Sequence, residues 1–124
     1  MDYKDLIAYK KGFSLAMEIF KVSKSFPKEE TYSLTDQIRR SSRSVCANIA
    51  EAYRKRRYVK HFISKLTDSD GENSETSTWL DFAFECEYIT KETHLDLNHK
   101  AVEIGKLINF MINNPDKFGC ISKE

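Results

Sequence analysis

The chain has 124 residues, of which 20 are lysine or arginine and 19 are aspartate or glutamate, so its formal net charge is +1. This length predicts one domain with its own core, and so small a net charge excludes overall charge as the basis for choosing a partner. No apolar run approaches the roughly 20 residues of a membrane span. The three cysteines are odd in number and widely spaced, which predicts reduced thiols, a cytoplasmic setting and no membrane partner.

Residues 4–24 are expected to form the first helix, because their apolar side chains recur with a helical period. Pro27 ends this helix, since proline lacks an N–H donor and disfavours helical backbone at the preceding residue. The predicted core stripe is Leu6, Tyr9, Phe13, Ala16, Met17 and Phe20.

A second helix is expected from residue 32 or 33 to about residue 55, and it has three different faces when its residues are placed 100° apart. One face is a core stripe, the next is a stripe of small polar side chains, and the third carries arginines. A helix that only covered a core would not need the polar stripe. The core stripe is Leu34, Ile38, Ser42, Val45, Ile49 and Ala52; the polar stripe is Gln37, Ser44 and Asn48; the arginines are Arg39, Arg40, Arg43 and Arg54.

The third helix is expected over residues 58–89, with a polar centre on its core line. Three short polar residues replace leucine or isoleucine there, and each costs about 1–3 kcal/mol if buried without a partner. They therefore hydrogen-bond across the bundle, meet the polar stripe of the second helix, face water in a channel, or lie on an exposed surface. Gly71 is expected to mark a kink or a close helix approach. The core line is Phe62, Leu66, Ser69, Asn73, Thr76, Leu80, Ala83 and either Glu87 or Tyr88.

A fourth helix is expected after Thr93 and ends near Asn113, since Asn114 and Pro115 follow. No segment shows the sustained alternation of a strand, and the short loops make neighbouring helices antiparallel. The sequence therefore predicts an all-α, antiparallel up-down four-helix bundle over residues 1–114 and a loosely ordered tail over residues 115–124. The predicted core stripe of the fourth helix is Ala101, Ile104, Gly105, Ile108, Met111 and Ile112.

Charge is distributed unevenly along the chain. Residues 36–60 contain eight basic and two acidic residues, whereas residues 67–90 contain seven acidic residues and no lysine or arginine. Either the two helices attract each other, or they form two surfaces with different partners. The basic segment is a candidate nucleic-acid site, because arginine holds phosphate bidentately. The alternative interpretation is a solvated helix end, whose cations interact favourably with the helix dipole. The candidate contacts are Arg39, Arg40, Arg43, Arg54, Lys55, Arg56, Arg57 and Lys60.

The segments LTDQIRR (residues 34–40) and SVCANIAE (residues 44–51) resemble the signature of the four-helix-bundle family of the 23S rRNA intervening-sequence protein. The family also includes relatives of the accessory protein of diversity-generating retroelements. The resemblance extends over residues 3–112 and implies a homo-pentamer with a central opening. It also implies a role on RNA or DNA, with a protein partner such as a reverse transcriptase. The subunit interface is then expected at the two polar stripes, formed by Gln37, Ser44, Asn48, Ser69, Asn73 and Thr76.

Motifs of common catalytic and metal sites are absent from the sequence. It contains no HExxH, P-loop, GxGxxG or GxSxG motif, and Asp96-x-x-His99 has no second copy to complete a bundle metal site. We therefore expect no enzyme activity, no metal and no cofactor. The leading hypothesis is a non-catalytic, accessory or chaperone-like protein that binds structured nucleic acid; the alternative is a protein–protein interaction scaffold.

Overall fold

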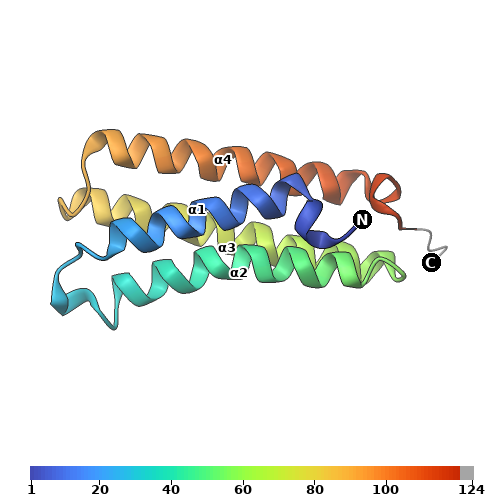
Figure 1. Ribbon diagram of the computed structural model, residues 1–124, viewed down its shortest axis with the longest axis horizontal. Coiled ribbons are helices and arrows are strands. Elements are labelled where there is room, and N and C mark those ends of the chain that lie inside the picture. Colours follow the sequence, from blue (N-terminus) through green and yellow to red (C-terminus); the bar gives the residue numbers. More distant parts are fainter. Residues whose placement is uncertain (121–124) are drawn as a thin grey trace.

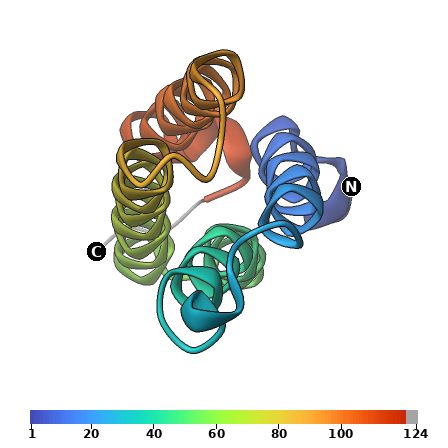
Figure 2. The same ribbon diagram turned by 90° about the vertical axis from the view of Figure 1, so that its left-hand side faces the viewer.

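A computed structural model describes residues 1–120 and consists mainly of four long helices lying side by side (Figure 1). Helix α1 covers Ile7–Ser23, α2 Leu34–Arg54, α3 Val59–Glu85 and α4 Lys91–Asn113. Consecutive helices run in opposite directions, and a view along the bundle shows them at the four corners in chain order (Figure 2). The described residues contain no strand, so the all-helical class and the four predicted helices are confirmed.

The predicted core stripes of α2 and α3 face the bundle interior. All six stripe residues of α2 are buried, as are the seven predicted core residues within α3, and Ile38, Phe62 and Leu66 are fully covered. The predicted continuation of the α3 line to Glu87 or Tyr88 is wrong, because both lie beyond the end of the helix and neither is buried. Helix α4 contributes Leu97 and four of its six predicted residues. Burial of one such large apolar side chain is worth about 1.5–3 kcal/mol, so this stripe-to-stripe packing is the main source of stability.

The polar centre of α3 lies inside the protomer. Ser69 donates a 2.8 Å hydrogen bond to the Val45 carbonyl of α2, and Asn73 Nδ2 donates one of 2.8 Å to the Ala101 carbonyl of α4. The prediction that this part of α3 lies in a subunit interface is therefore wrong, because its side chains are buried within one bundle and each makes a hydrogen bond there, although Asn73 Oδ1 has no partner. The residues corrected are Ser69, Asn73 and Thr76, with exposures of 0, 6 and 0%; Thr76 pairs with Ser41 at 2.9 Å.

Two glycines differ from each other in their surroundings. Gly71 is exposed, α3 continues through it, and no atom lies within 4 Å of where its Cβ would be, so neither a kink nor a close helix approach explains it. The close approach occurs at Gly12 of α1, where a Cβ would lie 3.2 Å from Cys46 Sγ of α2. Gly12 therefore sets how near α1 comes to α2.

Helix α3 ends four residues before the predicted residue 89. Glu87 adopts a left-handed conformation with φ of 64°, and the N–H groups of Tyr88 and Glu87 donate back to the carbonyls of Ala83 and Phe84 at 2.8 and 2.9 Å. This double hydrogen bond is the Schellman motif that commonly closes a helix. Because glutamate stands where glycine is usual, this helix end has no glycine by which it could be predicted.

The chain ends also differ from the predictions. Leu6 is extended and separates a short 3-10 helix, Tyr3–Asp5, from α1, so the predicted helix over residues 4–24 is interrupted. Beyond α4, Pro115–Phe118 forms another 3-10 helix, and Cys120 joins the core at 9% exposure. The predicted loose tail is therefore wrong for residues 115–120; its last four residues lie outside the described part.

Candidate nucleic-acid interface

The eight basic residues predicted to contact nucleic acid form two groups, one in the first half of α2 and one that runs from the end of α2 through the following turn to the start of α3. Arg39, Arg40 and Arg43 lie in the first half of the helix, and the second group begins at Arg54, 11 residues after Arg43. At about 1.5 Å per residue, the groups are ~16 Å apart along the helix axis. The structure therefore does not bring all eight together in one patch.

One member of the second group, Arg56, makes contacts within the protein itself. Arg56 lies with its guanidinium 3.6 Å from the centre of the Tyr53 ring, and its Nε donates a 2.8 Å hydrogen bond to the Tyr53 carbonyl. Its guanidinium lies beside Gly119, where an added Cβ would be 3.1 Å from a terminal nitrogen of Arg56, so Arg56 brings the α2–α3 turn next to the last described residues. The exposed members of this group are Arg54, Lys55, Arg57 and Lys60.

The first group contributes to a cluster of cations around one aromatic ring. The charged ends of Lys24, Arg39 and Arg43 lie 4.8, 4.8 and 5.8 Å from the centroid of Phe20, and Arg39 Nε also donates to Ser23 Oγ at 2.8 Å. Within residues 1–120 none of these three cations makes an ion pair. We call this arrangement the Phe20 cluster. Three unneutralised cations held close together favour an anion such as phosphate.

Sequence reasoning found only part of this cluster. It singled out Arg39 and Arg43 but placed Phe20 in the core and did not consider Lys24. The signal available was the spacing of Phe20 and Lys24, four residues apart, which puts an aromatic ring and a cation on one face of a helix.

Helix α1 has a second apolar stripe outside the core. The predicted stripe is wrong in part, since Phe13 and Met17 are 52 and 43% exposed. The residues that α1 buries are Leu15 and Ile19, together with Ala8, Gly12, Ala16 and Ser23. Both stripes repeat with the helical period, and the structure turns only one of them inward.

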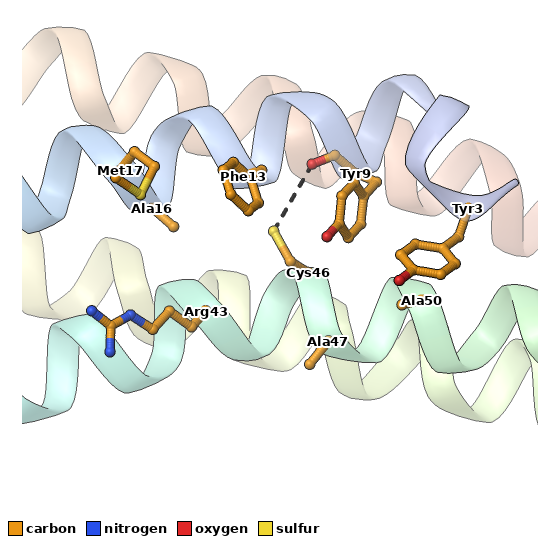
Figure 3. A pocket seen from close by; sticks show the side chains of 9 residues that line it. All are labelled: Tyr3, Tyr9, Phe13, Ala16, Met17, Arg43, Cys46, Ala47 and Ala50. Carbon is orange, nitrogen blue, oxygen red and sulfur yellow. Dashed lines mark hydrogen bonds between the residues drawn. The ribbon is translucent and has the colours of Figure 1, made fainter.

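The exposed stripe borders a groove of about 430 Å³ between α1 and α2, which we call the α1–α2 groove (Figure 3). Aromatic rings follow one another from the first 3-10 helix into α1, with centroid separations of 5.2 Å from Tyr3 to Tyr9 and 6.1 Å from Tyr9 to Phe13. Arg43 lies at the same end as Met17, so the groove leads toward the Phe20 cluster. Its lining is Tyr3, Tyr9, Phe13, Ala16, Met17, Arg43, Cys46, Ala47 and Ala50.

The Cys46 thiol and the Tyr9 hydroxyl of the groove remain uncharged at neutral pH. Burial raises the pKa of the Cys46 thiol to about 11, and burial, followed by the charges of Cys46, Tyr3 and Asp2, raises the pKa of the Tyr9 hydroxyl. Arg43 is therefore the one charged side chain in the lining. The groove is an apolar, aromatic channel with positive charge at one end.

The polar stripe of α2 faces outward. Gln37 is exposed, and Ser44 and Asn48 are half-buried, with Asn48 Nδ2 donating to the Ser44 carbonyl at 3.0 Å. At its N-terminal end Gln37 borders a second hollow of about 380 Å³, which we call the Trp79 hollow. Its lining is Glu30, Tyr32, Ser33, Leu34, Gln37, Trp79, Phe82 and Cys86.

The basic helix and the acidic helix do not neutralise each other by direct pairing. In the described part of the chain no arginine of α2 forms an ion pair with α3; the pair that joins these helices is Lys65 of α3 with Glu51 of α2, at 3.4 Å. Arg40 pairs weakly, at 3.9 Å, with Asp36 of its own helix. The charge of Arg40 also acts on α3 without an ion pair: burial, and then Glu75 and Asp68, raise the pKa of Glu72, and Arg40 opposes this rise.

Fold and surface define an all-helical, antiparallel four-helix bundle with a basic, aromatic face along α1 and α2. The family model of the 23S rRNA-intervening sequence protein matches residues 4–110, and the chain therefore belongs to this family. It is 33% identical to a protein of unknown function from the S23 ribosomal protein family of Bacteroides thetaiotaomicron VPI-5482, whose crystal structure superposes with a TM-score of 0.79. That similarity covers 89% of this chain and 98% of the other. None of the curated proteins compared with the chain matches it.

None of the helices in residues 1–120 combines the length and apolar character that a membrane crossing needs. The same residues contain no group of three or more His, Cys, Asp or Glu side chains placed to hold a metal ion.

Proposed function

We propose that this protein binds RNA or DNA through the basic face of α1 and α2 and acts as a non-catalytic, accessory or chaperone-like factor in the cytoplasm. The observation that carries the proposal is the Phe20 cluster, where three cations surround one ring and none makes an ion pair within the described residues. The family description, which names an intervening sequence of 23S rRNA, supports RNA as the polyanion.

The exposed cations of the second group extend this face. Arg54 lies on α2 near its end, and Lys55, Arg57 and Lys60 follow. Phosphate contacts position a protein on nucleic acid without reading its sequence, so we expect low sequence specificity. Binding then depends on counterion release and weakens steeply with salt.

We further propose that the chain assembles into a homo-oligomer, and specifically a pentameric ring. The outward polar stripe of Gln37, Ser44 and Asn48 supports it, since this stripe covers no core of its own bundle. Repetition of the basic face around a ring would raise affinity through multivalency. Light scattering at micromolar concentration tests this directly, and a species of 14.5 kDa would rule it out.

A protein partner is the second candidate, and the Trp79 hollow favours it. Tyr32 and Phe82 are 94 and 54% exposed there, and Trp79 Nε1 has no acceptor. Exposed aromatic side chains next to acidic α3 suit a basic protein, such as a reverse transcriptase bound to its nucleic acid. If protein binding were the only function, the protein would not bind nucleic acid even at low salt.

Fluorescence anisotropy with labelled RNA and duplex DNA at two salt concentrations tests the main proposal. We expect binding at about 50 mM salt that falls by orders of magnitude at 200 mM. The double variant Arg39→Gln/Arg43→Gln should bind ~10- to 100-fold more weakly and lower the salt slope by about 2.

The matched control is Lys91→Gln/Lys106→Gln, which removes two exposed lysines of α4. It loses the same net charge but lies away from the Phe20 cluster, so its affinity should stay within about threefold of the wild type. Equal losses in both double variants would mean that only net charge matters. An absence of binding by the wild type at low salt would overturn the proposal.

A further inference from the structure

The α1–α2 groove and the Phe20 cluster are continuous, and together they indicate which part of a nucleic acid this face binds. Arg43 belongs to both: it lines the groove and lies 5.8 Å from the Phe20 centroid. Met17 and Phe20 are three residues apart on α1 and therefore neighbours on the helix surface. An apolar channel thus opens directly onto three cations.

The groove has the shape and chemistry of a slot for a flat ring. Its α2 wall carries the small side chains of Cys46, Ala47 and Ala50, so a ligand can approach the helix backbone. Its α1 wall carries Tyr9 and Phe13, whose rings are not enclosed by the core. Its volume of about 430 Å³ falls within the range of about 300–1,000 Å³ that is usual for small-molecule sites.

Aromatic rings beside a phosphate-binding group are how proteins hold unpaired nucleotides. Each base stacks on a ring, the backbone follows the positive charge, and the sequence matters little. A duplex cannot use such a slot, because its bases are already stacked and paired inside the helix. The apolar slot and the cations therefore complement an unpaired nucleotide at both of its ends.

We infer that the α1–α2 groove takes an unpaired base from a single-stranded segment, while the Phe20 cluster holds the adjoining phosphate. This inference rests on the proposed function, and it adds the part of the nucleic acid that is recognised. Lys24, Arg39 and Arg43 neutralise the phosphate, and Phe13 and Tyr9 receive the base. The protein therefore prefers single strands, loops or bulges to continuous duplex.

Three labelled DNA probes of about 12 nucleotides test this inference: a single strand, its duplex and an abasic strand of equal length. The abasic strand keeps the phosphates and removes the bases. The wild-type protein should bind the single strand roughly tenfold or more tightly than the abasic strand, as stacking of one or two bases predicts.

Two variants of the groove keep all the charges. Phe13→Ala removes an exposed ring, and Ala50→Trp fills the slot. Each should lower affinity for the single strand about fivefold or more while leaving affinity for the abasic strand within twofold. The matched control is Phe82→Ala, since Phe82 is 54% exposed on α3 and Phe13 is 52% exposed on α1. Circular dichroism verifies folding, and Phe13→Ala serves alone if Ala50→Trp unfolds.

The outcomes separate the inference from the function on which it rests. The inference is supported if the wild type prefers the single strand to the abasic strand, if both groove variants lose this preference, and if Phe82→Ala keeps it. Equal binding of all three probes, unchanged by Phe13→Ala, overturns the inference and leaves electrostatic binding intact. No binding of any probe overturns both. Dissociation of an oligomer by Phe13→Ala, seen by light scattering, overturns the inference by assigning the groove to a subunit contact.

Discussion

Helix α1 packs against two neighbours, and its two seams are built differently. Along the seam with α4, opposite charges meet: Lys11 lies 3.4 Å from Glu103, and Lys100 lies 2.8 Å from Glu18. Along the seam with α2, Arg39 and Arg43 meet the Phe20 ring and make no ion pair in the described residues. One seam is closed by neutralised pairs, whereas the other leaves positive charge and aromatic surface open.

This difference separates stability from function. A bundle that needed only to stay folded would place carboxylates opposite its arginines, since like charges that gather without partners repel one another. It would also bury its aromatic rings. Features that lower stability without a local compensation are characteristic of functional surfaces, which is why the α1–α2 seam, and not the α1–α4 seam, is the candidate binding face.

The largest expected effect distinguishes the two apolar stripes of α1. Ile19 is 1% exposed, so Ile19→Ala should lower the free energy of unfolding by about 2–5 kcal/mol through lost burial and a residual cavity. Phe13 is 52% exposed, and Phe13→Ala should cost less than about 1 kcal/mol. Urea denaturation followed by circular dichroism measures both. Similar losses for the two variants would mean that Phe13 is buried in solution, and hence that the α1–α2 groove is occupied.

The same two stripes explain how far the sequence predicts this fold. Each of α2 and α3 has a single core line with a helical period, even where small polar residues interrupt its apolar ones, and every predicted core residue within these helices is buried. Helix α1 has two apolar lines of equal period, and periodicity cannot choose between them. Tertiary packing chooses: the missing side chain of Gly12 lets α1 approach Cys46 closely, which turns Leu15 and Ile19 inward and leaves Phe13 outside.

The candidate site could be predicted only on the α2 side. The arginine face of α2 is visible in one segment, so Arg39 and Arg43 were found. Their companions Phe20 and Lys24 lie on another helix, and only the packing of α1 on α2 brings them together. The polar residues of α3 could be recognised as unusual from the sequence. Whether Asn73 forms its hydrogen bond within the bundle or between subunits depends on how the helices pack, which the sequence pattern does not specify.

The second prediction concerns the thiol in the α1–α2 seam. Burial raises the pKa of Cys46 to about 11, so at pH 8 it stays protonated, and its reaction with iodoacetamide should accelerate as the pH rises toward 11. Because this pKa is well above that of an ordinary thiol, the thiolate fraction at pH 8 is on the order of 100-fold smaller. Alkylation of Cys46 should be slower by a similar factor. Exposed Cys86 is the internal reference. Mass spectrometry of each modified peptide gives the rates, and equally fast modification of Cys46 would show an open seam.

The third prediction separates two neighbouring arginines at the end of the basic face. Arg56→Ala removes the stack on Tyr53 and the hydrogen bond to its carbonyl, and should lower the free energy of unfolding by about 1–2 kcal/mol. Arg54 is exposed, and Arg54→Ala should change stability by less than about 0.5 kcal/mol. Thermal denaturation measures this difference, while anisotropy should show a loss of RNA affinity for Arg54→Ala. A stable Arg56→Ala variant with impaired binding would reverse these assignments.

The smallest expected effects are the sharpest test of the two seams, because they have opposite signs. Hydrogen bonds to Glu18 and then Asp96 raise the pKa of Lys100; their contribution is full below the ordinary lysine pKa and is lost as the pH rises through the raised value. Lys100→Gln should therefore destabilise at pH 7, by no more than about 0.5 kcal/mol for so exposed a pair. Arg43→Gln relieves the repulsion from Arg39, four residues away, and gives up only a long contact with the Phe20 ring, at 5.8 Å, so it should stabilise by a few tenths of a kcal/mol.

Salt provides the control for this last pair of variants. Screening weakens attraction and repulsion alike, so both differences from the wild type should shrink toward zero in about 1 M NaCl. Urea is a suitable denaturant because it is uncharged, so the ionic strength is set by the added NaCl alone. If Arg43→Gln destabilised the protein as Lys100→Gln does, Arg43 would have a stabilising partner, and the open seam would lose the unneutralised charge on which its assignment to nucleic acid depends.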